Sequence, residues 1–206
     1  MRRRNNTVLA AGLAFVDKAT STTDQITIPS GASEDDLAVL FDYAIDNSPN
    51  FSTPTGWTDV GTESSSGGGG GGCRISYKVL GVSDPGSTIT GSNNDTNKKV
   101  MLVFTGNSVT VTPASYLGSF ESGGEPISVT VTSSGGTTPL IIFGHYSEDS
   151  SSANLTGSTA FDAEEQGSDG GQLVGYKIVT SSPANHTVDS TSTASSAVLQ
   201  GFYIEV

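Results

Sequence analysis

Short apolar runs, separated by polar stretches rich in glycine, serine, threonine and asparagine, follow one another along the chain. Ile26 and Ile28 alternate with polar residues, which is the period-two pattern of a strand that buries one face. The stretches 37–44 and 140–146 are almost continuously apolar, which is typical of a strand at the centre of a sheet or buried on both sides. The pattern therefore predicts an all-β chain of strands and turns.

Each half of the chain supplies five or six of these segments. The expected strands lie at 13–17, 25–29, 37–44, 74–80, 87–90 and 98–105, and at 115–120, 127–132, 140–146, 173–179, 186–189 and 197–205. Long polar loops are expected at 45–72 and 147–171. The first loop ends in 64–72, where six consecutive glycines would make a regular element entropically costly.

The chain also repeats itself. Ser-Tyr-Lys-Val-Leu at 76–80 returns 99 positions later as Gly-Tyr-Lys-Ile-Val at 175–179, and the apolar run 37–43 corresponds to 140–146. A repeat of about 100 residues is too long for one solenoid unit. It has the size of half a β-sandwich or half a β-barrel.

The repeat predicts the domain organisation. We expect a basic arm at 1–7, copy one at about 8–106 and copy two at about 108–206. Only a short connection, 105–108, separates the copies, so we expect a single pseudo-symmetric β-sandwich of jelly-roll type in which the copies bury each other. Two tandem sandwiches are the alternative.

Composition supports the all-β assignment and argues against some classes of binding partner. Its 31 serines, 25 threonines and 26 glycines make up about 40% of the chain. The net charge of −12 argues against binding of nucleic acid or of an anionic membrane. It fits an acidic soluble protein, or one that meets a basic surface or cations. No apolar run approaches the roughly 20 residues of a membrane span, and Cys73 as the only cysteine excludes an intrachain disulfide.

The N-terminus combines basic and apolar residues. Arg2, Arg3 and Arg4 precede the apolar stretch 8–16, an order that superficially matches a secretion signal. That stretch runs into charged residues without a small-residue cleavage site, so we expect a strand to begin at Leu13 instead. The three arginines then form a basic arm on an acidic body, for which a contact with a neighbouring subunit is predicted. A frayed terminus is the alternative.

The residue types of catalytic and metal sites are sparse. His145 ends an apolar strand beside acidic residues, but its counterpart in copy one is Asp42, and no ligand or nucleophile accompanies it at a suitable spacing. His186 lies in a polar stretch and is expected at the surface. One cysteine and two distant histidines do not make a zinc cluster. The glycine run lacks the Lys-Ser/Thr and the helix of a phosphate loop.

Two loops offer oxygen atoms of the kind that calcium binds. Asp162, Glu164, Glu165 and Asp169 lie in one of them, and 93–95 in the other. Neither loop has the spacing of an EF-hand, so solvated acidic loops are the favoured interpretation. No carboxylate pair of the glycosidase kind is singled out. We therefore expect no catalytic residue, no metal ligand and no cofactor.

Trp57, the only tryptophan, stands in Pro-Thr-Gly-Trp-Thr at 54–58 on an expected loop. An exposed indole there could stack on a sugar ring or contact another subunit. Packing as a lid over the edge of the sandwich is the favoured alternative. Trp57 and the three arginines are the residues for which a partner or glycan contact is considered.

Five short motifs, in this order, resemble small structural proteins of tailed bacteriophages, in which IPxG, GDLLV, PxGWT and YK recur. They are Ile-Pro-Ser-Gly (28–31), Asp-Leu-Ala-Val-Leu-Phe (36–41), Pro-Thr-Gly-Trp (54–57), Ser-Tyr-Lys-Val (76–79) and Pro-Gly-Ser-Thr-Ile-Thr-Gly (85–91). The sequence Glu34-Asp35-Asp36 replaces the usual Gly-Asp. The resemblance covers copy one well, and copy two only through the internal repeat.

The resemblance implies a non-enzymatic virion component on the surface of the phage particle, and it brings no catalytic residue. Its expected partners are other virion proteins, capsid or tail subunits, and further copies of itself. The leading hypothesis is a capsid decoration (cement) protein that stabilises the assembled shell. The alternative is a tail fibre or tail-associated adhesin that binds host surface glycans. A polysaccharide-degrading enzyme is the least favoured of the three.

Overall fold

A computed structural model describes the chain in twelve stretches, and the account that follows concerns these residues. They are 13–45, 51–64, 71–91, 96–105, 112–121, 128–132, 140–148, 155–156, 161–166, 172–179, 185–190 and 197–205. Their regular elements are all β-strands, and each strand pairs with its neighbours in antiparallel fashion. The all-β class predicted from the sequence is confirmed.

The described residues form fifteen strands, which follow one another along the chain. Those of the first half are β1 (Phe15–Ser21), β2 (Gln25–Thr27), β3 (Leu37–Ile45), β4 (Thr58–Ser64), β5 (Gly71–Val79), β6 (Thr88–Thr90) and β7 (Thr96–Phe104). Those of the second half are β8 (Thr112–Glu121), β9 (Ser128–Thr132), β10 (Leu140–Glu148), β11 (Leu155–Thr156), β12 (Ala163–Gln166), β13 (Gln172–Val179), β14 (Asn185–Ser190) and β15 (Ala197–Glu205).

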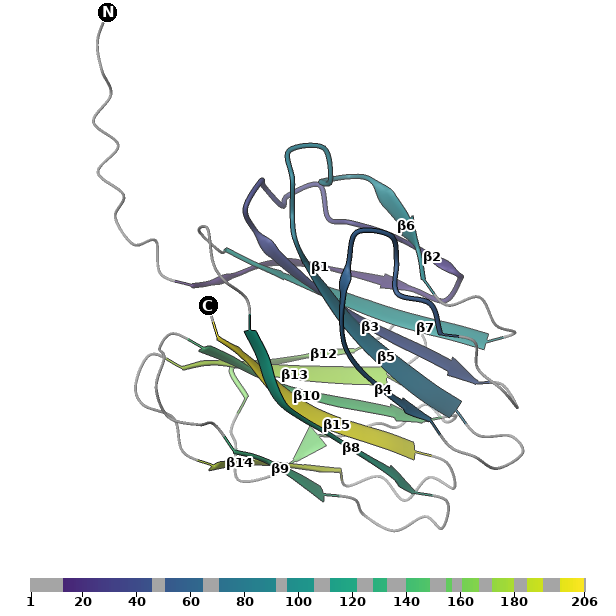
Figure 1. Cartoon of the computed structure of the whole chain (residues 1–206), viewed down its shortest axis with the longest axis vertical. Coiled ribbons are helices and arrows are strands. Elements are labelled where there is room, and N and C mark those ends of the chain that lie inside the picture. The colour runs from purple at the N-terminus through teal and green to yellow at the C-terminus, as the bar shows by residue number, and fades with distance from the viewer. Residues whose placement is uncertain are drawn as a thin grey trace, which may run out of the picture.

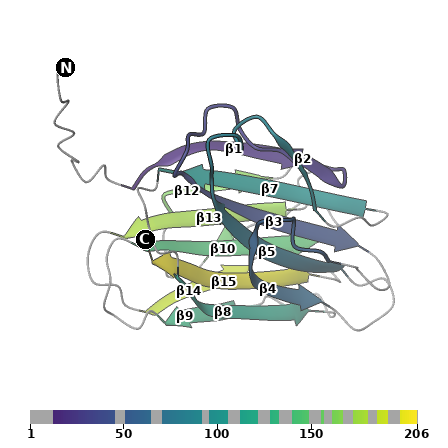
Figure 2. The ribbon, with the colours of Figure 1, turned by 45° about the horizontal axis from the view of Figure 1, so that its top comes forward.

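The strands form four layers (Figures 1 and 2). Two five-stranded sheets, ordered β1-β7-β3-β5-β4 and β12-β13-β10-β15-β8, lie face to face in the middle. The ribbon β2-β6 covers the outer face of the first sheet, and the small sheet β11-β14-β9 lies on the other side of the second. A β-sandwich therefore forms the centre of the molecule, as expected.

The two halves have the same strand order. Replacing β1, β7, β3, β5 and β4 by β8, β15, β10, β13 and β12 converts one large sheet into the other, and β2-β6 corresponds to β9-β14. Across the sandwich, β4 contacts β8, β5 contacts β15 and β7 contacts β13, while Lys18 on β1 pairs with Glu165 on β12. If the corresponding strands of the two halves are exchanged, the contact of β4 with β8 becomes that of β12 with β1, and the contact of β5 with β15 becomes that of β13 with β7. The topology therefore has pseudo-two-fold symmetry. The duplication of the sequence stays a prediction.

One apolar core joins the two large sheets. Alternate residues of β3, β5 and β7 meet alternate residues of β10, β13 and β15. At the centre, the rings of Phe41 and Phe143 lie 5.7 Å apart, and Phe143 stacks on Phe202 at 4.8 Å. Near one edge, Phe15 stacks on Tyr176 of the other sheet at 5.3 Å. Both sheets therefore bury their inner faces in the same core.

The register of the expected repeat is wrong in two of the three strand pairs. Aligning 37–43 with 140–146 sets Phe41 against Gly144, yet Phe41 and Phe143 are the residues that share the core. The offset of 99 likewise sets Leu102 against Gly201, whereas Phe202 faces the core. Because side chains alternate between faces, a strand alignment that is off by one residue exchanges its two faces.

The expected long loops contain three strands that the sequence pattern did not indicate. β4 lies within 45–72, and β11 and β12 lie within 147–171. β4 has one large apolar residue, Val60, and a bulge between Asp59 and Gly61, as edge strands often do. Gly71 and Gly72 continue β5 opposite Ile45 and Ala44, so part of the glycine run is held by its neighbour strand and is not loop.

Phe143→Ala tests whether the halves share one core. We expect the free energy of unfolding to fall by about 3–5 kcal/mol, since this ring is fully buried between the sheets. Denaturant titration followed by fluorescence of Trp57, which lies in the other half, should show one transition shifted to lower denaturant.

The control for this measurement is Val82→Ala, because that side chain is 79% exposed. It should change the free energy of unfolding by no more than about 0.5 kcal/mol. If the transition reported by Trp57 occurs at the same denaturant concentration in Phe143→Ala as in the parent chain, the two halves do not share one core.

Candidate functional site

The five short motifs singled out in the sequence come together where the ribbon β2-β6 covers the large sheet of the first half. Ile28, Leu40, Trp57 and Ile89, each from a different motif, pack in a second apolar cluster between the ribbon β2-β6 and the large sheet. The fourth motif, 76–79, lies within β5 and leads into Leu80 of the same cluster. The motifs are therefore parts of one packed unit.

Backbone hydrogen bonds tie the same motifs together. The N–H of Ile28 donates to the carbonyl of Ser87 at 2.9 Å, and the N–H of Gly86 donates to the carbonyl of Ile28 at 3.0 Å. The N–H of Leu80 donates to the carbonyl of Asp36 at 2.8 Å, and the N–H of Asp35 donates to the carbonyl of Leu80 at 2.9 Å. These four hydrogen bonds are made by loops that connect the strands of the first half.

Trp57 is a core residue, so an exposed stacking platform was the wrong expectation for it. Its side chain is 8% exposed and belongs to the cluster under the ribbon. The turn that carries it is closed by a hydrogen bond from the Trp57 N–H to the carbonyl of Pro54 at 3.0 Å. Gly56 has a φ of 80°, a conformation that glycine adopts readily. The alternative interpretation, an indole that covers the sheet, fits this placement.

The outward face of the ribbon β2-β6 carries polar side chains. Ile26 and Ile89 face each other on the inner side, while Thr27 and Thr88 form the adjacent pair on the outer side, with Oγ1 atoms 3.1 Å apart. Gln25 and Thr90 form the next exposed pair of positions. This outer face therefore offers hydroxyl and amide groups, and no charge.

Two open hollows flank the ribbon. One, of about 330 Å³, is lined by residues 19–21, 23, 25–27 and 88. The other, of about 320 Å³, is lined by 54, 55 and 88–90. Thr88 borders both of them. Their walls consist largely of threonine and serine, so they offer hydrogen bonds to a polar ligand or to a partner surface.

The second half has a matching polar pair. Thr130 on β9 and Thr187 on β14 are register partners whose Oγ1 atoms lie 3.4 Å apart. Val129 and Val131 alternate with Thr130 and are buried. Threonine pairs thus occupy corresponding outer strands of both halves.

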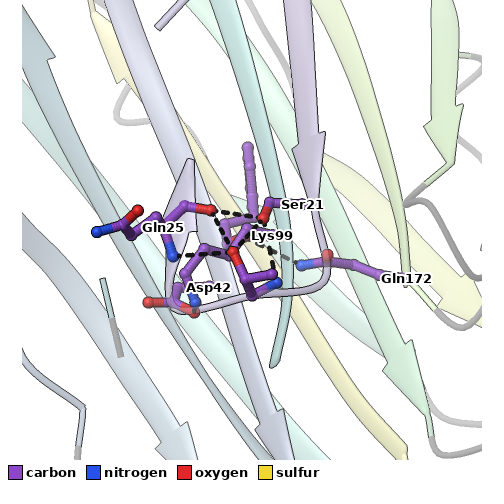
Figure 3. A network of polar contacts seen from close by, with 7 residues as sticks. Ser21, Gln25, Asp42, Lys99 and Gln172 are labelled. Atoms are coloured by element: carbon purple, nitrogen blue, oxygen red, sulfur yellow. Dashed lines mark hydrogen bonds and ion pairs between the residues drawn. The ribbon is translucent and has the colours of Figure 1, made fainter. Parts of the chain in front are cut away.

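A buried ion pair lies beneath the β1–β2 turn (Figure 3). Asp42 on β3 and Lys99 on β7 are register partners, and Lys99 Nζ lies 2.7 Å from Asp42 Oδ1. Their side chains are 3% and 0% exposed. They alternate with the core-facing Phe41 and Val100, so they point to the outer side of the large sheet. The charges therefore stabilise each other in a site that water does not reach.

Neighbouring groups enclose this pair. Gly91, whose N–H donates to the carbonyl of Asp24 at 2.8 Å, leaves no room for a side chain: a Cβ there would lie 2.5 Å from Asp42 Oδ2. Arg74, the register partner of Asp42 on β5, directs its guanidinium to Asp59 Oδ1 at 2.9 Å and to the carbonyl of Phe51 at 2.7 Å. Lys99 is thus the cation bonded to Asp42.

Other ionisable groups in the described part of the chain stabilise loops or pack between the layers. Asp84 accepts from Lys78 Nζ at 2.8 Å and from the Gly81 N–H at 2.7 Å; the bond from Lys78 is the main reason that its pKa is lowered. Burial raises the pKa of Tyr176, with further contributions from Glu165 and Asp162. These roles are structural.

The carboxylates considered as calcium ligands have structural roles where the structure describes them. Asp162 Oδ2 accepts from the N–H of Ile178 at 2.8 Å, and Glu165 pairs with Lys18. Asp169 and the stretch 93–95 lie outside the described residues. Among the described residues, no group of three or more His, Cys, Asp or Glu side chains could hold a metal ion.

Several predicted residues lie outside what the structure describes. Arg2, Arg3 and Arg4 belong to this set, and so do the side chains of His145 and His186, whose backbones run in β10 and β14. In the described part of the chain, no helix has the length and apolarity to cross a membrane. The structure therefore brings together the motifs of the first half and leaves the basic arm unplaced.

The ion pair was missed at the level of sequence, although a signal was present. Asp42 is the one charged residue in the apolar run 37–44, and Lys99 directly precedes the run 100–104. A charge inside a strand of this kind requires a partner. Only the pairing of β3 with β7 identifies it, because the two residues are 57 positions apart.

Comparison with known proteins gives no relative: no family model, no curated protein and no solved structure matches this chain.

Asp42→Ala is expected to lower the free energy of unfolding by at least about 3 kcal/mol, because it leaves the Lys99 ammonium buried without its partner. Urea denaturation of the purified chain would measure the loss. Asp59→Ala is the matched control: it breaks the pair with Arg74, in which the aspartate is 43% exposed, and should cost within about 1 kcal/mol. Equal losses for the two variants would contradict a dry ion pair.

Proposed function

We propose that this chain is a non-enzymatic structural protein of a tailed-phage particle, and specifically a decoration (cement) protein that binds the outside of the assembled capsid. The observation that carries the proposal is the use of the motifs that resemble phage structural proteins. Their residues join the ribbon β2-β6 to the large sheet of the first half through apolar packing and backbone hydrogen bonds. Motifs that define an architecture fit a structural protein better than they fit an enzyme.

The surface chemistry supports docking in preference to catalysis. The polar face of the β2-β6 ribbon and the threonine pair of the β9-β14 strands suit contacts with other proteins, which combine hydrogen bonds with close packing. On a capsid, these surfaces would fill the space between shell subunits and add buried area against internal pressure. The acidic body and the three N-terminal arginines fit a partner surface of mixed charge.

Quantitative mass spectrometry of purified particles tests this proposal. We expect the chain in a copy number comparable to that of the major shell subunit, and we expect particles without it to release their DNA at lower temperature. The matched sample is the same phage with the gene deleted. Absence of the chain from the particles would overturn the virion assignment, and presence at the tail alone would overturn decoration.

The hollows beside the ribbon favour a second candidate, a tail-associated adhesin that binds host surface glycans. Sugars are recognised through hydrogen bonds to their hydroxyl groups, and the walls of both hollows are rich in threonine. This candidate uses the surface around Thr88 and makes no use of Trp57, whose indole is buried.

Thr88→Val separates the two candidates. If the hollows bind glycans, the substitution should weaken binding on a glycan array about two- to tenfold, which is the worth of one neutral hydrogen bond. The control is Thr130→Val, which removes the corresponding hydroxyl from the second half and should leave that binding unchanged. No binding by the parent chain, or equal losses in both variants, would exclude the adhesin function of this face.

A further inference from the structure

The ion pair of Asp42 and Lys99 differs from a second Asp–Lys pair in the described part of the first half. Lys78 and Asp84 lie 2.8 Å apart with side chains 25% and 17% exposed. Lys99 and Asp42 lie 2.7 Å apart with side chains 0% and 3% exposed. The two Nζ–Oδ1 distances are alike, but only the side chains of Lys78 and Asp84 are accessible to water. A lysine and an aspartate held together without water are placed for a reaction that water otherwise opposes.

We propose that Lys99 and Asp42 condense into an isopeptide bond that cross-links β3 to β7. A proton first passes from Nζ to Oδ1 along their hydrogen bond, which gives a neutral amine and a carboxylic acid. The Nζ lone pair then forms a bond to Cγ, and the Cγ–Oδ1 bond breaks. Oδ1 leaves as water with two of the three ammonium protons, while the third stays on the amide nitrogen. No oxidant, reductant or further reactant is needed.

The protein environment favours each step. Burial keeps water away from the two side chains, which opposes hydrolysis of the amide that forms. The paired strands hold the reacting groups in contact, and such proximity replaces an encounter in solution. Leu40 and Met101, one register step along on the same face, belong to the apolar cluster. The amide product is uncharged, which removes two charges from this apolar site.

Gly91 and Arg74 are neighbours of Asp42. Gly91 lies against Oδ2, the oxygen that remains as the amide carbonyl, while Lys99 is bonded to Oδ1, the oxygen that leaves. The Arg74 guanidinium is bonded to Asp59 and to the carbonyl of Phe51, so it does not replace Lys99 as the partner of Asp42. The cross-link joins positions 57 residues apart and restricts the unfolded chain accordingly.

The mass of the denatured full chain tests this inference, which does not rest on the proposed function. The folded protein, once unfolded for the measurement, should be lighter than its sequence mass by one water. A tryptic digest should contain a branched peptide that joins the segment of Asp42 to that of Lys99, with no cleavage after Lys99. Cleavage after Lys78 should stay normal, because its partly exposed pair with Asp84 is the internal control.

Lys99→Arg keeps the positive charge but removes the amine, so this variant should have its full sequence mass. The inference is overturned if the parent chain has its full sequence mass. It is also overturned if water is lost while trypsin still cleaves after Lys99, since dehydration at another aspartate, such as Asp169 before Gly170, would then explain the mass. A branched peptide that persists in Lys99→Arg would place the cross-link elsewhere and overturn it too.

Discussion

The face-to-face packing of the two five-stranded sheets is the interaction on which the rest of the structure depends. A chain in which serine, threonine and glycine make up about 40% of the residues has few large apolar side chains to form a core. Burial of each one contributes about 1.5–3 kcal/mol, so their concentration in one place matters. Phe41 and Phe143 from the two central strands meet there, and each sheet completes the core of the other.

The outer layer of the first half depends on this arrangement and adds a different kind of contact. Its apolar cluster lies on the reverse side of strands that the main core already holds in place. Beside that cluster, Asp42 and Lys99 occupy a site closed by Gly91. A buried ion pair is weak evidence for stability, but removal of one partner is costly. The pair therefore ties β3 to β7 on the outer side of the large sheet.

The contrast between packed motif residues and polar outer side chains connects the structure with the proposed role. Residues of the five short motifs pack between the ribbon β2-β6 and the large sheet. The outward groups of the ribbon β2-β6 and of the strand pair β9-β14 include hydroxyls, represented by Thr27, Thr88 and Thr130. Such groups suit docking to another surface, because each can donate or accept a hydrogen bond.

The sequence by itself determined the class of the fold and most of the strands, since alternation and apolar runs are local signals. It did not determine β4, whose side chains are mostly polar, because that strand is held by the backbone of β5. Nor did it determine the register of the repeat, the burial of Trp57 or the pairing of Asp42 with Lys99. These were decided by the tertiary structure alone, because each depends on which distant strand lies opposite and on which face of the sheet is covered.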